Sequence, residues 1–150
     1  MYTAKQVARY IINKRSVDRR PIGNLTLQNL LYLVWIEYHK RENTRLFDDR
    51  ICAWQFGPVV PEVYYDYCAY GGMDIDRRYE RDEIGIAEAD MAILDASLAK
   101  YLDCSVSQLV SMTHAREKPW YQIYVKLGGI RQEIPFGLIE EMECRKPVCD

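Results

Sequence analysis

The side chains that could do acid–base or nucleophilic chemistry are few and scattered in this 150-residue sequence. There are only two histidines, His39 and His114, and the acids that lie close together are Asp48–Asp49, Asp74 and Asp76. Paired carboxylates can serve as a general acid and base. Aspartates of this kind more often form turns by bonding their own backbone, and we favour that interpretation. The sequence therefore predicts no catalytic carboxylate pair.

Sulfur chemistry is also weakly represented. The sequence lacks Cys-x-x-Cys, and its five cysteines are scattered: Cys52, Cys68, Cys104, Cys144 and Cys149. A zinc site needs Cys and His at matching spacing, so we expect no metal and no cofactor. A thiol nucleophile made from Cys52 or Cys68 with His114 stays open as an enzyme alternative. A cysteine in an apolar segment is more often a small buried hydrophobe, and we expect a non-enzymatic protein.

The composition is that of a globular chain, with 49% hydrophobic and 28% charged residues. We expect one domain, residues 1–150, large enough for its own core. No apolar run is long enough to span a bilayer and no apolar signal segment opens the chain, so we expect a cytoplasmic protein without membrane contact. The net charge of −2 is uneven. Residues 1–50 carry ten Lys/Arg and five Asp/Glu, whereas residues 51–150 carry ten and seventeen. The basic first third suggests either a solvated helix face or contact with nucleic acid.

The clearest predicted helix starts near Gly23 and carries one buried apolar stripe: Leu27, Leu30, Leu31, Val34, Trp35 and Tyr38. A first helix should begin after Thr3 as N-cap, followed by a charged linker from Arg15 to Pro21. The run Leu46 to Tyr64 follows the second helix. There, residues 50–55 favour a short strand, and Gly57 to Pro61 should form a rigid reversal that enters a helix at Pro61.

The rest of the sequence, from residue 61 onward, predicts helices separated by loops. Residues 73–86 are expected to be a loop with a short second strand at residues 78–80, and residues 145–150 a loose tail. Helices are expected at residues 61–69 and 88–101, from Val106 (burying Leu109 and Met112), from Pro119 (burying Trp120, Ile123, Tyr124 and Leu127), and from Pro135 (carrying Phe136, Ile139 and Met142). The predicted fold class is mainly α, a compact single-domain bundle of about six to seven helices with at most one small strand pair.

The aromatic residues divide into two groups. Trp35 and Trp120 lie on helix stripes and should be core. Trp54 and the nearby Tyr64, Tyr65, Tyr67 and Tyr70 cannot all face inward on one short helix. They indicate either a partner-binding surface, where Tyr and Trp are favoured, or an ordinary boundary of the core.

Three blocks of sequence together resemble the Panacea domain, the family of SocA-like antitoxins and phage-associated proteins. They are Ile22 to Tyr32, Leu46 to Tyr64 with its Ala-Trp-x-x-Gly-Pro-Val-x-Pro core, and Leu109 to Trp120. The middle block is the specific one. Two positions depart from the family pattern: Gly23 stands where Thr is common, and Asn29 stands where Lys is usual. The second change should remove one charge from the helix surface.

The resemblance implies a helical domain without catalytic residues that neutralises a cognate toxin, encoded beside it, by direct binding. Some members are thought to deliver the toxin to a cellular protease. The resemblance names no particular toxin and no oligomeric state. The candidate partner-binding residues are Trp54, Phe56, Gly57, Pro58, Val59, Pro61, Tyr64, Tyr65, Tyr67, His114, Glu117 and Trp120.

Two alternative interpretations of these residues and of the function remain open. Gly57, Pro58 and Trp54 individually favour a purely structural role, because rigid corners pack cores. A phage-associated regulator that binds nucleic acid or a host protein is the functional alternative. Nucleic-acid binding is disfavoured, since the Leu27 helix has a wide apolar face and only Lys40 and Arg41 near its end.

Overall fold

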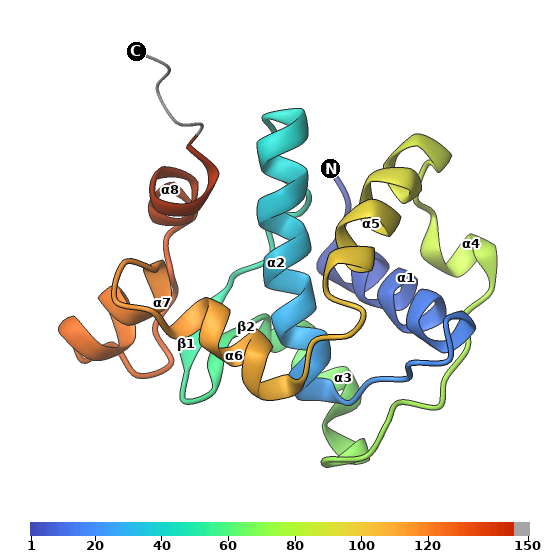
Figure 1. Ribbon diagram of the computed structural model, residues 1–150, viewed down its shortest axis with the longest axis horizontal. Coiled ribbons are helices and arrows are strands. Elements are labelled where there is room, and N and C mark those ends of the chain that lie inside the picture. The colour runs from blue at the N-terminus through green and yellow to red at the C-terminus, as the bar shows by residue number, and fades with distance from the viewer. Residues whose placement is uncertain (146–150) are drawn as a thin grey trace.

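The centre of the fold is helix α2 (Asn24–Glu42), which other elements surround on most sides (Figure 1). The computed structural model describes residues 1–145, and within it every residue from 27 to 36 is buried. Five elements pack on α2: helices α1 (Ala4–Val17), α3 (Pro61–Tyr67), α5 (Glu88–Lys100) and α6 (Val106–His114) and strand β2 (Gly57–Val59). The predicted helix is confirmed, but the single apolar stripe is wrong, because a helix enclosed by neighbours is buried all round. Asn29, expected on the surface, is only 1% exposed.

Helix α1 (Ala4–Val17) starts as predicted. The Thr3 side chain accepts from the Gln6 N–H and the Gln6 side chain accepts from the Thr3 N–H, which satisfies two donors at the helix start. The helix continues further than expected and includes Arg15, which the sequence placed in a linker. Arg15 is buried because its side chain folds back to donate to the backbone carbonyl of Arg20.

The strand pair is a hairpin of β1 (Cys52–Trp54) and β2 (Gly57–Val59), joined by the turn Gln55–Phe56. The first strand was predicted, whereas the second strand expected at residues 78–80 is wrong. Ala53 faces Pro58 and directs both its N–H and its carbonyl to the opposite side, toward residues 131–132. Pro58 can therefore lie in a strand without losing a ladder hydrogen bond.

A series of hydrogen bonds from side-chain amides joins the corner Gly57–Pro61 to α2. Helix α3 (Pro61–Tyr67) begins at Pro61 as predicted. Val59 belongs to strand β2, and the N–H of the next residue, Val60, points to α2. That N–H donates to Gln28 Oε1 over 2.9 Å. Gln28 in turn donates to Asn24 Oδ1 over 3.1 Å, and Asn24 donates to the Tyr64 carbonyl over 3.0 Å. Three side-chain bonds thus position the corner and α3 on one helix.

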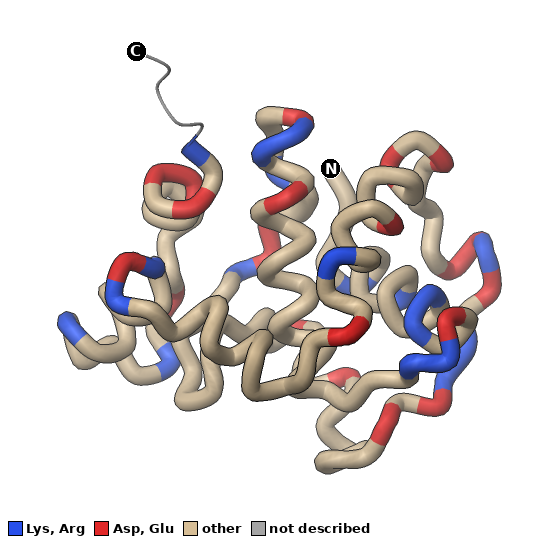
Figure 2. The backbone as a smooth tube through the Cα atoms, in the orientation of Figure 1, with Lys and Arg blue, Asp and Glu red and all other residues tan. Residues whose placement is uncertain are grey.

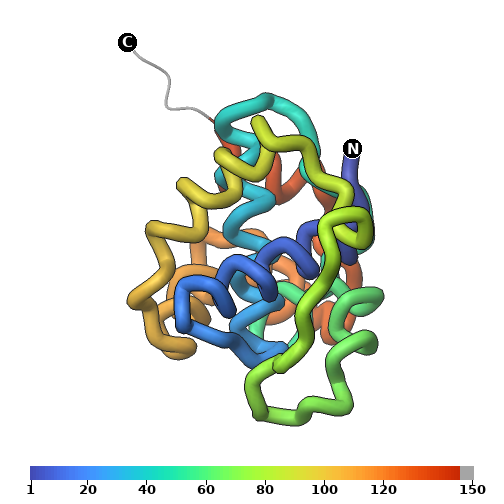
Figure 3. Tube along the Cα trace, turned by 90° about the vertical axis from the view of Figure 1, so that its right-hand side faces the viewer, coloured from blue at the N-terminus to red at the C-terminus, as the bar shows by residue number. Residues whose placement is uncertain are grey.

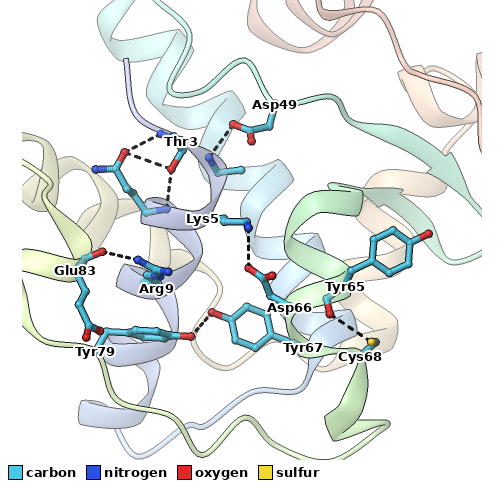
Figure 4. A network of polar contacts seen from close by, with 12 residues as sticks. Thr3, Lys5, Arg9, Asp49, Tyr65, Asp66, Tyr67, Cys68, Tyr79 and Glu83 are labelled. Carbon is cyan, nitrogen blue, oxygen red and sulfur yellow. Dashed lines mark hydrogen bonds and ion pairs between the residues drawn. The ribbon is translucent and has the colours of Figure 1, made fainter.

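The chain after α3 runs through a 3-10 turn (Cys68–Tyr70). Residues 71–87, which we call the strap, then cross α1 (Figure 3). Its contacts with α1 include a hydrogen bond from Arg9 to the Glu83 carbonyl, 2.9 Å long (Figure 4). The strap contains the short helix α4 (Arg81–Ile84), which sequence reasoning missed. Figure 4 also shows the Tyr67 hydroxyl bonded to Tyr79 on the α1 side, whereas Tyr65 points to the other side of α3.

The second half supplies α5 (Glu88–Lys100), α6 (Val106–His114), α7 (Pro119–Tyr121) and α8 (Phe136–Ile139). Helices α7 and α8 each continue as a π-helical turn, Gln122–Lys126 and Glu140–Cys144. Two expected core residues, Met112 and Leu127, are exposed. Leu109 and Thr113 are the buried residues of α6. The wider π turn before Leu127 rotates Leu127 away from the position that a 3.6-residue spacing gives it.

The described residues contain eight α-helices and one two-stranded sheet, which confirms a mainly α fold with one small strand pair. The helix beyond the predicted six or seven is α4. The expected loose tail falls, from residue 146 onward, outside the described residues. Within residues 1–145, no helix is long and apolar enough to cross a membrane.

Replacing Gln28 with leucine should lower the free energy of unfolding by about 1–3 kcal/mol, because the buried Val60 N–H loses its acceptor. Urea denaturation measures the change. Gln55→Leu is the matched control: Gln55 is exposed in the hairpin turn and should change stability by less than about 0.5 kcal/mol. Equal effects of the two substitutions would contradict this role of Gln28.

Candidate functional site

A pocket of about 450 Å³ opens beside the β1–β2 turn. Its walls are mainly apolar and aromatic, its polar lining is mainly amide, and one charged side chain reaches it. The lining residues are Asn24, Leu25, Gln28, Trp54, Gln55, Phe56, Val59, Tyr64, Cys68, Gly71, Tyr124, Ile130 and Arg131. An apolar concavity with a few placed polar groups is the usual form of a binding site.

Large apolar side chains are exposed around this pocket. Phe56 and Tyr65 are each 58% exposed and Ile130 is 66% exposed. Trp54 is half-buried and meets Tyr64 edge-on, with 4.9 Å between ring centroids, and it also contacts Tyr65 at 6.1 Å. A cluster of exposed apolar side chains of this kind indicates a contact surface.

The surface beside the pocket is also poor in charge. Residues 51–61 and 104–115 contain no Lys, Arg, Asp or Glu, and they form the hairpin and helix α6 (Figure 2). Charged residues gather instead on α1, the strap, the C-terminal end of α2, the α6–α7 turn and the π turn after α8 (Figure 2). An uncharged surface with exposed aromatic residues has the composition of the central part of a protein interface.

Several predicted site residues lie beneath this surface. Gly57, Pro58, Val59, Pro61 and Trp120 are buried. Tyr67 is buried as well, but on the α1 side of α3, where its hydroxyl bonds to Tyr79 (Figure 4). Trp120 donates its indole N–H to the Trp54 carbonyl over 2.7 Å and stacks on His114, with ring centroids 3.8 Å apart. His114 also bonds to the backbone of Phe56. These two residues therefore hold the hairpin turn from behind. Glu117 is exposed in the turn between α6 and α7, outside the pocket lining.

Gly57 is required by its backbone and by its neighbours. Its φ of +123° is a conformation that side chains with a Cβ rarely adopt. A Cβ at this position would lie 3.2 Å from Thr113 Oγ1 and 3.4 Å from His114 Nε2. The glycine thus lets the hairpin approach α6 and α2 closely, which gives the Gly-Pro motif a structural purpose.

Two buried acceptors face this glycine without a hydrogen-bond partner among the described residues, Asn29 Oδ1 and His114 Nε2. Burial lowers the pKa of His114, and its bond to the Phe56 backbone opposes that shift only in part. The neutral imidazole is therefore the form that the fold favours.

Arg131 is a residue of the pocket that sequence reasoning missed. Its N–H donates to the Ala53 carbonyl over 2.7 Å, and the Ala53 N–H donates to the Gln132 carbonyl over 2.8 Å. Arg131 and Gln132 thus both pair with Ala53, which makes this a β-bulge. The first bulge residue, Arg131, has a φ of +61°, a backbone conformation that normally takes glycine. The arginine costs on the order of 1 kcal/mol there. Its guanidinium lies 4.5 Å from the centroid of the Trp54 ring. No sequence motif marks such a bulge.

The Cys–His nucleophile is not assembled. Burial raises the pKa of the Cys52 thiol, which disfavours the thiolate. Cys68 is exposed, but its thiol donates to the Tyr65 carbonyl over 3.3 Å. In residues 1–145, three or more His, Cys, Asp or Glu side chains nowhere gather in a way that could hold a metal ion.

The lowered pKa of His114 predicts a pH dependence of stability. The unfolded chain binds the proton more tightly, so the stabilisation is complete above the ordinary value of 6.5 and is lost as the pH falls from there toward the lowered pKa. Urea denaturation between about pH 7.5 and about pH 5.5 should show this loss in the wild type. His114→Asn keeps a side-chain donor for the Phe56 backbone and should lose less stability over that range. An identical pH slope in both proteins would contradict the assignment.

Comparison with known proteins gives the family. The family described as "Antitoxin SocA-like, Panacea domain" matches residues 27–121, which include α2, the hairpin, α3, α5 and α6. The chain is similar to Antitoxin SocA of Caulobacter vibrioides, with 31% identity over 127 residues that cover 78% of this chain and 68% of that protein. No solved structure matches. The fold and the aromatic hairpin described above thus belong to a chain that is a member of the SocA-like antitoxin family, defined by the Panacea domain.

Proposed function

We propose that this protein is an antitoxin that neutralises its toxin by binding it directly, and that the toxin docks on the pocket beside the β1–β2 turn. The observation that carries the proposal is the exposure of Phe56, Tyr65 and Ile130 around a pocket with aromatic walls. Family membership supplies the toxin–antitoxin context.

The physical basis is the binding energy that such a surface supplies. Aromatic side chains that fill or line a pocket at the centre of an interface carry most of its affinity. Phe56 and Tyr65 are exposed in the free chain, so a partner gains by covering them. Neutralisation of this kind needs contact only, and the protein acts without catalysis of its own.

The buried members of the predicted site have a different role in this proposal. Gly57, Pro58 and Pro61 set the path of the corner, and Trp120 and His114 fix its turn through the bonds to Trp54 and Phe56. The pocket and α1 belong to one packed unit in this proposal, which the packing of α2 on both α1 and α6 supports.

Nucleic-acid binding is the weaker candidate. Half of the ten basic residues among the first fifty pair with acids: Lys5 with Asp66, Lys14 with Asp18, Arg20 with Asp103, Arg45 with Glu140 and Arg50 with Glu62. Phosphate-backbone binding depends on several cations that are free to pair with phosphates. Among the described residues that line the pocket, Arg131 alone carries a positive charge.

Co-expression with the product of the adjacent gene tests the proposal in cells. That product should stop growth alone and should be harmless beside the wild-type chain. A neighbour that is harmless alone, or that stays toxic beside this chain, would overturn the proposal. The toxin level in the rescued cells, with and without their proteases, then separates blocking by binding from delivery for degradation.

Point substitutions test the docking surface. Phe56→Ser and Tyr65→Ser should each weaken toxin binding by about tenfold or more, because they remove exposed anchors that the fold does not need. Isothermal titration calorimetry with the purified toxin measures the change. Val17→Ser on α1 is the control, since Val17 is an exposed apolar residue outside the pocket. Equal affinity of all three variants would place the interface elsewhere.

A further inference from the structure

Arg131 brings a charged side chain to the pocket described above. It is the one charged side chain in the pocket lining, and the ion pairs among the described residues do not include it. Its contact is with the face of Trp54, at the mouth of the pocket. A cation at the rim of an apolar pocket, with no acid beside it in the lining, is complementary to a negative group on the occupant.

The backbone at this residue gives a second and independent indication. A glycine would adopt the φ of +61° without strain, yet the chain carries a long charged residue at this bulge. Bulges redirect side chains, and this one places the guanidinium over Trp54. Strained positions of this kind gather where function requires a particular direction.

The pocket also combines two parts of the sequence. Trp54, Phe56 and Tyr64 lie within residues 27–121, which match the family. Ile130 and Arg131 lie beyond that range and complete the rim. The wall thus comes from the part matched to the family, and the charged rim comes from a segment outside it. Such a division suits a common docking mode with an individual specificity element.

Resting on the proposed function, we propose that Arg131 determines which toxin is bound. The occupant is a toxin segment whose apolar side chain enters the pocket between Trp54 and Phe56 and whose neighbouring carboxylate pairs with the Arg131 guanidinium. A guanidinium binds a carboxylate through two parallel hydrogen bonds, and stacking on an aromatic ring holds it in place for that geometry. A protein segment fits better than a nucleic acid, because residues 51–61 and 104–115 supply no cation for further phosphates.

Arg131→Gly is the sharpest test, because glycine suits the bulge and the variant should fold at least as stably as the wild type. Calorimetry with the purified product of the adjacent gene should show binding weakened by roughly tenfold or more, together with a weaker dependence on salt. Arg131→Lys keeps the charge without the planar fork and should fall between the two. Arg131→Glu should bind more weakly than Arg131→Gly, and an acid-to-lysine substitution in the toxin should restore its binding.

The outcomes separate the two proposals. If Arg131→Gly binds like the wild type while Phe56→Ser weakens binding, the specificity role of Arg131 is overturned and the docking surface stands. If the wild type does not bind the adjacent product, both proposals fall. Binding of the wild type to a poly(dT) oligonucleotide that Arg131→Gly abolishes, without any toxin binding, would overturn the choice of a protein partner.

Discussion

The hydrogen bond between the Val60 N–H and Gln28 is the constraint on which the rest of the structure depends. A corner stiffened by Pro58 and Pro61 has few backbone donors, and the Val60 N–H, which directly precedes Pro61, is buried against α2. A buried donor without an acceptor is costly, so a polar residue is needed on a helix that is otherwise core. Gln28 meets that need, and Asn24 extends the bonding to α3. The direction of α3, and with it that of Tyr64 and Tyr65, follows from this attachment.

Contacts on the buried side of the hairpin turn fix its conformation, while Phe56 on its outer side stays exposed. The hairpin turn is held by Trp120 through the Trp54 carbonyl and by His114 through the Phe56 backbone. Phe56 therefore lies in a fixed turn, so less conformational entropy is lost when a partner covers it. The same close packing explains Gly57, because a Cβ there would press on Thr113 and His114.

Arg131 reaches this surface from a segment distant in sequence. The segment pairs with the free edge of β1, and the bulge there directs the arginine over Trp54. The pocket is therefore completed by a late part of the chain that adds charge to an apolar wall. A common scaffold with a variable rim is a physically simple way for related binding proteins to distinguish their partners.

Much of this architecture could be predicted from the sequence, because local signals are strong where they act alone. Thr3 and Ser105 cap helices through their own side chains, and Pro61 and Pro119 begin helices because a missing N–H costs nothing there. Other features depended on tertiary contacts. Asn29 is buried because neighbouring elements enclose α2. The second strand lies at Gly57–Val59 because these residues pair with β1. The left-handed backbone conformation of Arg131 could not be predicted from the neighbouring residue types, because pairing with Ala53 imposes it. The sequence by itself determined most of the helices, their starts and the Trp-Gly-Pro corner, because those depend on residues a few positions apart. Only the tertiary structure decided which aromatic residues face solvent and that Arg131 joins them, because burial and pairing arise between segments far apart in the chain.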